Sequence, residues 1–165
     1  MRTQLSPKLV ALILLCIGSI QGIAISQLAN AQPPPKDPNN FVPGFGELMD
    51  GIQLRHAKLW FAGVNANWAL AGFLVDEITE DFDDVMVYRP TYKRESIVET
   101  TQLLLAEPLQ NLFNAVVNQD RKQFERAFDS LSQACNACHA QIGIPFVVIQ
   151  RPTAPPLTNQ QYSPP

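Results

Sequence analysis

The sequence predicts an all-α fold, an antiparallel four-helix bundle followed by an extended, proline-rich C-terminal tail. Between residues 44 and 143, four stretches repeat apolar residues at three- and four-residue steps, which is the spacing of an amphipathic helix. The breaks between these stretches are short, and short connections favour antiparallel packing of consecutive helices. Most of the 14 prolines lie outside this region, towards the two ends of the chain, where they disfavour helix.

The first 31 residues have the pattern of a secretory signal peptide. Arg2 and Lys8 flank a short polar region, an apolar stretch runs from Leu9 to about Ile25, and Ala29-Asn30-Ala31 supplies the small residues that signal peptidase requires. We expect cleavage before Gln32 and export to the bacterial periplasm or an equivalent extracytoplasmic compartment. Because the apolar stretch is long, an uncleaved membrane anchor stays open as an alternative.

The charge of the expected mature chain excludes one class of function. Removal of Arg2 and Lys8 lowers Lys plus Arg from 12 to 10 against 15 Asp plus Glu, so the formal net charge moves from −3 to −5. Binding to nucleic acid needs a basic face, and a modestly acidic chain does not supply one. The remaining length suits one domain with a single core.

The first two helices are expected after a proline-rich lead at residues 32–43. Apolar residues at helical spacing begin after Pro43-Gly44 and continue to Gly63, where the polar residues 65–67 interrupt them. A second helix is expected from Trp68 to Val87. Residues 88–92 are expected to form a loop, because Pro90 and the residue before it resist helix.

The third and fourth helices are separated by a polar turn at residues 118–120. The third is expected from about Arg94 to Val117, and Pro108 should bend it or split it near Ala106. Asp120 is expected to cap the fourth helix. Gly143 should end that helix at residue 143, since glycine readily adopts the backbone conformation that follows a helix.

The tail, residues 144–165, is rich in proline and is expected to be extended. Its segment Phe146-Val147-Val148-Ile149 is strongly apolar. Side chains of this kind are unfavourable in water, so we expect the tail to pack back on the bundle.

The fourth helix carries the most informative motif of the chain, Cys135-Asn136-Ala137-Cys138-His139. Residues three apart on a helix share a face, so both thiols can add to the two vinyl groups on one edge of a porphyrin. The histidine that follows can then bind the iron as the proximal ligand. C-x-x-C-H is the attachment signature of a c-type haem, and the sequence therefore predicts one covalently bound haem c held by Cys135 and Cys138, with His139 on the iron.

Two other uses of these cysteines fit the sequence less well. A thioredoxin-type C-x-x-C would lie near a βαβ pattern, and the sequence shows none. A structural zinc site needs four ligands, and once Cys16 is removed with the signal peptide, His56 is the remaining candidate for the fourth. In an oxidising compartment free thiols tend to pair, and two thioether bonds to haem would consume both thiols of the mature chain.

The position of the motif at the end of the last helix resembles cytochrome c prime and its six-coordinate relatives. The resemblance covers residues 41–143 in pattern, and Cys135, Cys138 and His139 match the family residue by residue. It implies an exported four-helix haem protein. Residues 140–143 differ from the family in lacking a basic residue after the haem histidine, and the tail has no counterpart there.

The ligand on the other face of the iron is expected from the first helix, which should lie across the haem from His139. Met49 and His56 are two turns apart on one face of that helix, and both residue types can ligate haem iron. The resemblance implies a distal position well into this helix, so the register favours His56 over Met49. The alternatives are a buried, hydrogen-bonded His56, a Met49 that belongs to the core, and an open sixth position.

The function expected from these features is one-electron transfer with a redox partner protein, by an electron carrier rather than an enzyme. A gas-binding or gas-sensing haem protein with an open sixth site is the first alternative, and a non-enzymatic haem subunit of a larger redox complex is the second. A homodimer stays open. The acidic residues between Asp76 and Asp84 are expected to be a solvated face, or a surface that docks a basic partner.

Overall fold

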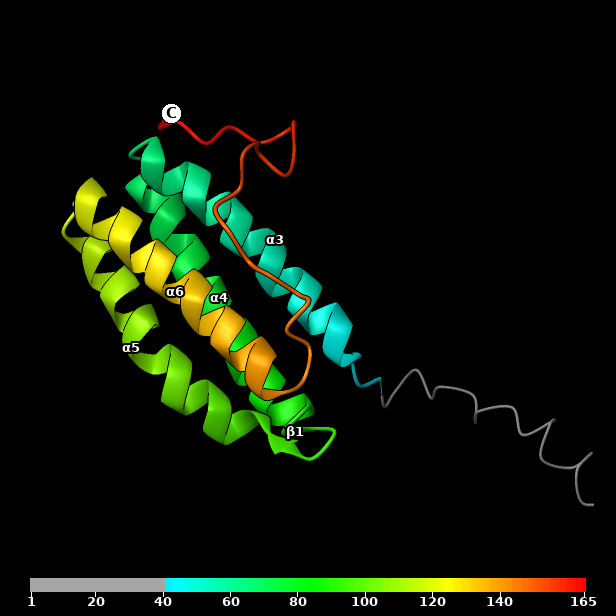
Figure 1. Ribbon diagram of the computed structural model, residues 1–165. Helices are drawn as coiled ribbons and strands as arrows, with labels where there is room; N and C mark the ends of the chain where they lie inside the picture. The colour runs from blue at the N-terminus through cyan, green and yellow to red at the C-terminus, as the bar shows by residue number, and fades with distance from the viewer. Residues whose placement is uncertain (1–40) are drawn as a thin grey trace, which may run out of the picture. The chain divides into compact units, whose positions relative to one another are not determined.

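Four helices account for most of residues 41–165, the part of the chain that the computed structural model describes. The elements are α3 (Phe45–Val64), α4 (Trp68–Tyr88), β1 (Thr91–Tyr92), β2 (Glu95–Ser96), α5 (Ile97–Val117) and α6 (Arg121–Gln141) (Figure 1). The all-α class is thereby confirmed. The predicted signal peptide at residues 1–31 and most of the proline-rich lead at 32–43 lie outside the described residues.

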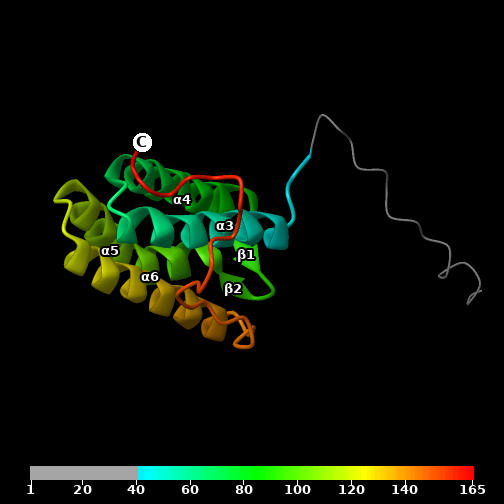
Figure 2. The same cartoon turned by 90° about the horizontal axis from the view of Figure 1, so that it is seen from above.

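The four helices form a ring of pairwise contacts. Each of α3, α4, α5 and α6 contacts its neighbour in the chain, and α3 also contacts α6; Figure 2 shows the four lying side by side along a common direction. Short turns at residues 65–67 and 118–120 connect α3 to α4 and α5 to α6. The apolar stripes meet between the helices, and the largest fully buried side chains include Leu59, Ile78, Leu105, Leu112, Phe124 and Phe128.

Local signals in the sequence account for the helix ends. Side-chain oxygens of Asn67, Ser96 and Asp120 accept hydrogen bonds from backbone N–H groups in the first turns of α4, α5 and α6, which satisfies donors that a helix leaves free. The predicted cap at Asp120 is confirmed. Gly143 has a φ of 78° just beyond α6, as predicted for a glycine that ends a helix.

The connection between α4 and α5 differs from the predicted loop at 88–92. Tyr88 is the last residue of α4, and β1 pairs with β2 in an antiparallel hairpin that aligns Thr91 with Ser96. Because residues 95 and 96 belong to this hairpin, α5 begins at Ile97 and not near Arg94. Strands of two residues are too short to show an alternating pattern in the sequence.

Pro108 does not split the third helix. The α-helical conformation continues from Ile97 to Val117, and Figure 1 shows the axis of α5 curving along its length. Proline removes one backbone hydrogen bond and strains the preceding turn. Leu105 and Leu112 on either side are fully buried, so packing holds the helix together through the proline.

The two helices α3 and α6 approach most closely at the C-terminal end of α3. A Cβ atom built on Gly63 would overlap the ring of Phe124, so glycine is required at this contact. The Phe124 ring packs among Trp60, Trp68 and Phe128 with centroid distances of 6.0 to 6.4 Å. We call these four aromatic residues and Gly63 the aromatic end of the α3–α6 interface.

The tail runs back over the helices (Figure 1). Asn136 bonds the backbone of Ile149, and Arg151 forms an ion pair with Asp129 at 2.6 Å. Of the apolar segment 146–149, Phe146 and Val148 are 79% and 66% exposed. The expected burial of these two side chains is wrong, because the backbone of the segment, and not these side chains, faces α6.

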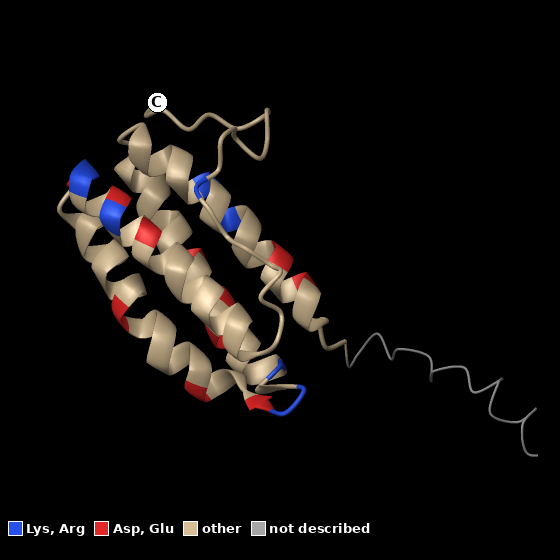
Figure 3. Cartoon of the chain, viewed as in Figure 1, with Lys and Arg blue, Asp and Glu red and all other residues tan. Residues whose placement is uncertain are grey.

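The charged groups lie on the outer faces of the helices and at the hairpin, where two basic residues, Lys93 and Arg94, separate the strands (Figure 3). Of the acidic residues on α4, Glu77 and Asp81 pair with Arg55 of α3 at 3.1 and 3.0 Å. The others, Asp76, Glu80, Asp83 and Asp84, are exposed.

Among the helices of residues 41–165, none combines the length and apolar character of a membrane span.

Candidate functional site

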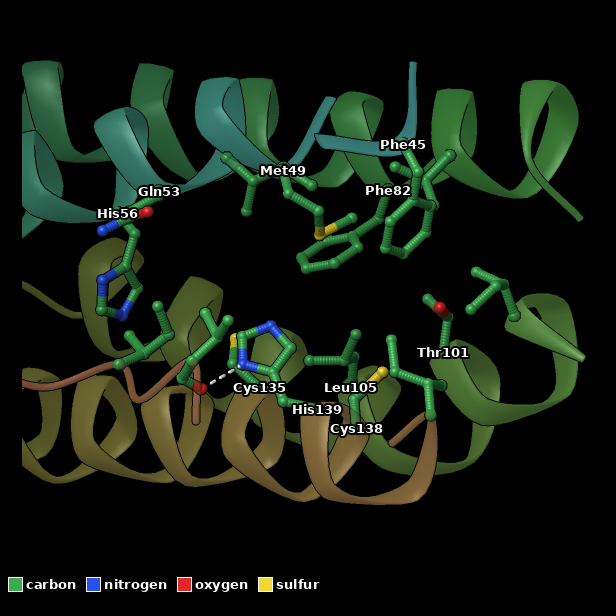
Figure 4. A pocket seen from close by; sticks show the side chains of 16 residues that line it. Phe45, Met49, Gln53, His56, Phe82, Thr101, Leu105, Cys135, Cys138 and His139 are labelled. Atoms are coloured by element: carbon green, nitrogen blue, oxygen red, sulfur yellow. Dashed lines mark hydrogen bonds between the residues drawn. The ribbon is translucent and has the colours of Figure 1, made fainter. Parts of the chain in front are cut away.

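All five site residues proposed from the sequence line one hollow. Met49 and His56 reach it from α3, and Cys135, Cys138 and His139 reach it from the C-terminal half of α6 (Figure 4). The hollow contains about 660 Å³ of space outside protein atoms, open solvent included. Its walls are mainly apolar and include Phe45, Ile52, Phe82, Val85, Ile97 and Leu105.

The imidazole of His139 has one nitrogen occupied and one directed into the hollow. Nδ1 lies 2.7 Å from the carbonyl oxygen of Val147. A carbonyl can only accept, so Nδ1 carries a proton, and in the neutral ring Nε2 keeps its lone pair. Figure 4 shows the ring standing in the hollow with the second nitrogen pointing away from the Val147 bond. A metal-binding histidine is held in this way, by a hydrogen bond from its other nitrogen.

The two cysteines are half-buried, unpaired thiols. Burial raises the pKa of Cys135 to about 12, and burial also raises the pKa of Cys138. Both therefore remain protonated at neutral pH. Redox-active C-x-x-C motifs depend on a lowered thiol pKa, commonly at a helix N-terminus. Here the motif lies near the C-terminus of α6 and the shift has the opposite sign, which disfavours the thioredoxin-type alternative.

His56 is buried beside the hollow and already has a hydrogen-bond partner. Its Nε2 is 3.0 Å from the hydroxyl oxygen of Ser132, and that hydroxyl donates to the carbonyl of Phe128. Because the hydroxyl has one proton, His56 is the donor and is protonated on Nε2. The ring also stacks on Phe128 at 4.2 Å. Burial lowers the pKa of His56 to about 4, so the ring is neutral at physiological pH.

Met49 enters the hollow from the opposite side to His139. The side chain is partly buried against the core, and Figure 4 shows its sulfur directed into the space between α3 and α6. A thioether is a weak hydrogen-bond acceptor and a known ligand of haem iron in c-type proteins. The structure thus places a thioether sulfur across the hollow from Nε2 of His139.

These residues fit a haem better than a bare metal ion. Within residues 41–165, no three His, Cys, Asp or Glu side chains come together as a metal site made of protein alone would need. A porphyrin brings four of its own nitrogens, so the protein must supply only one or two axial ligands. An apolar hollow beside two half-buried thiols and one imidazole nitrogen directed into the hollow meets that requirement.

Three contributors to the site were not predicted from the sequence. Val147 acts through its backbone carbonyl, which carries no sequence signal. Ser132 bonds His56 across the α3–α6 interface, and Asn136, a variable position of the motif, bonds the tail. Of these, only Asn136 offered a signal, since it is a polar residue one position from a half-buried cysteine.

The comparisons with known proteins returned no relative. No protein-family model, no curated protein and no solved structure matches the chain. The assignment of the site therefore depends on the geometry and chemistry of its own residues.

Proposed function

We propose that this protein is an exported mono-haem c-type cytochrome that transfers single electrons to or from a partner protein, built on an antiparallel four-helix bundle. The observation that carries the proposal is the pairing of Cys135 and Cys138 with a His139 whose Nε2 is free and whose Nδ1 is bound by Val147. A structural core would need neither the pair of cysteines nor a histidine oriented in this way. Together they meet the requirements for covalent attachment and axial ligation.

Each residue of the site has a defined task. Cys135 and Cys138 would hold the porphyrin by thioether bonds, and His139 would bind the iron through Nε2. When bound, the haem supplies an iron that can accept and release one electron. The apolar walls of the hollow exclude water and so influence the reduction potential.

For the sixth ligand, the contacts favour Met49 over His56. The register along α3 favoured His56, but Nε2 of His56 donates to Ser132 and its ring is stacked on Phe128. Ligation through Nε2 would break this hydrogen bond and move the imidazole proton to Nδ1, and the loss of one such bond costs about 0.5–1.5 kcal/mol. Met49 has its sulfur in the hollow already and gives up no such bond.

The covalent haem is tested by mass spectrometry of the exported protein. The expected mass is that of one haem added to a chain beginning at Gln32. Acid acetone should fail to extract the haem, because thioether bonds resist it. A mass equal to that of the bare polypeptide would contradict the proposal.

The sixth ligand is tested by absorption spectra of the reduced protein with and without carbon monoxide. With Met49 on the iron, the wild type should be low-spin and should resist carbon monoxide, and its oxidised form should show a weak sulfur-to-iron band in the near infrared. Met49→Ala should become high-spin and bind carbon monoxide, whereas His56→Ala should change the spectrum little. The reverse pattern would assign His56. A wild type that is already high-spin and binds carbon monoxide readily would favour gas binding over electron transfer.

A further inference from the structure

The acceptor for the His139 imidazole comes from the C-terminal tail. The carbonyl of Val147 lies eight residues beyond His139 in the chain and 2.7 Å from its Nδ1. Burial does not hold this carbonyl in place, because Val147 is exposed and its neighbours Phe146 and Val148 are more so. The position of the carbonyl must therefore be fixed by other contacts of the backbone.

Hydrogen bonds fix the chain on both sides of Val147. Before it, Ile144 donates to the carbonyl of His139 at 2.8 Å, and Val147 donates to the carbonyl of Ile144 at 3.0 Å. After it, the side chain of Asn136 donates to the carbonyl of Ile149 at 2.9 Å and accepts from the N–H of Ile149 at 2.7 Å. An amide side chain carries both a donor and an acceptor, so asparagine can form this pair where a purely donating or accepting side chain cannot.

Arg151 anchors the tail two residues further along. Its guanidinium contacts both carboxylate oxygens of Asp129, at 2.6 and 2.7 Å, and lies over the ring of Trp60 at 4.4 Å from the centroid. A bidentate guanidinium–carboxylate pair has a defined geometry. The anchor thus ties the tail to α6 through Asp129 and to α3 through Trp60.

We propose that residues 144–151 form a strap that sets the donor strength of His139, with Asn136 and Arg151 as positioning residues. The inference rests on the proposed function, because it assigns His139 to the iron. A hydrogen bond from Nδ1–H to a carbonyl makes the opposite nitrogen a stronger donor. Stronger donation stabilises the oxidised iron, so the strap lowers the reduction potential.

The test compares the reduction potentials of the haem-loaded, full-length wild type, Asn136→Ala and Arg151→Ala. Gln133→Ala is the matched control, since Gln133 is exposed on the same helix, six residues before His139. Asn136→Ala should raise the equilibrium constant for reduction about tenfold, which is about 59 mV for one electron. Arg151→Ala should shift the reduction potential in the same direction by a smaller amount, and Arg151→Lys should recover part of that shift. The reduction potential of Gln133→Ala should match that of the wild type.

A second readout separates positioning from general stability. The Nδ1–H proton of His139 should exchange slowly with solvent in the wild type and faster in Asn136→Ala, while the spin state stays unchanged. If Asn136→Ala attaches haem poorly, Arg151→Ala, which lies outside the motif, decides the question.

The strap and the haem assignment fail in different ways. A protein that carries covalent haem but whose potential and Nδ1–H exchange are unaffected by Asn136→Ala and Arg151→Ala overturns the strap alone. A bare polypeptide overturns the proposed function and the strap with it.

Discussion

The two ends of the α3–α6 interface are built in opposite ways. At the aromatic end, Gly63 lies so close to Phe124 that no Cβ would fit, and four aromatic rings fill the space. At the other end, a hollow lies between Met49 of α3 and the motif Cys135–His139 of α6, with residues of α4, α5 and the tail completing its walls. The difference shows that one helix pair can be packed tightly by its own side chains at one end and leave an apolar hollow at the other.

His56 lies at the boundary between these ends. Its ring stacks on Phe128 of the aromatic end and also lines the hollow. The bond to Ser132 joins α3 to α6 at this level. We therefore regard His56 as an extension of the aromatic end of the α3–α6 interface, and the hollow begins on the far side of its ring.

The largest expected effect is at the hollow end. Replacement of both Cys135 and Cys138 by Ala should abolish covalent attachment, because no thiol would remain to form a thioether; either single replacement should leave one bond. Acid acetone extraction followed by mass spectrometry measures the result. Ser130→Ala, on the exposed side of the same helix, is the control and should keep its haem. Covalent haem in the double variant would refute the role of the motif.

At the aromatic end, Phe124→Ala should destabilise the fold without touching the haem motif. Phe124 is fully buried, and truncation of such a side chain costs about 3–5 kcal/mol. Denaturant unfolding of the haem-loaded protein measures the loss. Phe113→Ala, at a half-exposed ring on α5, should cost much less. An altered haem spectrum in folded Phe124→Ala would show that the two ends are not independent.

The boundary residue predicts a dependence of stability on pH. Burial lowers the pKa of His56 from 6.5 to about 4, so between these values the unfolded chain binds the proton more readily. The contribution of neutral His56 to the free energy of unfolding is fully present above pH 6.5. It is lost as the pH falls to about 4, and the loss amounts to about 3 kcal/mol. His56→Gln should remove this part of the pH dependence while keeping a neutral donor for Ser132. Identical unfolding profiles of the two proteins between pH 6.5 and 4 would be inconsistent with a buried neutral imidazole.

The smallest of these effects is expected from Gly63→Ala. The added methyl group must displace Phe124, which is enclosed by other rings, and overpacking of this kind costs about 1–3 kcal/mol. Gly46→Ala is the matched control on α3, because a Cβ there meets open space. Combining Gly63→Ala with Phe124→Leu should cost less than the sum of the two single changes, since the smaller side chain makes room. Strict additivity would mean that the two residues do not compete for space.

The sequence predicted most helix boundaries because the signals for them are local. The cap at Asp120 and the glycine at 143 act within one turn of the helix they delimit. The hairpin at residues 91–96 was missed because two-residue strands have no readable period. Pro108 was expected to bend or split α5, and burial of Leu105 and Leu112 overrode the tendency to split.

For the candidate site, the sequence by itself determined that two thiols and a histidine lie together on α6, because their spacing on one helix depends only on local geometry. It also limited the candidates for the proposed opposing ligand to residues on one face of α3. The proposed preference for Met49 over His56, and the bond between His139 and Val147, depended on the tertiary structure. Both are contacts between groups on different segments, one of them a backbone carbonyl that every residue type possesses, so only the packing of the chain decides which groups meet.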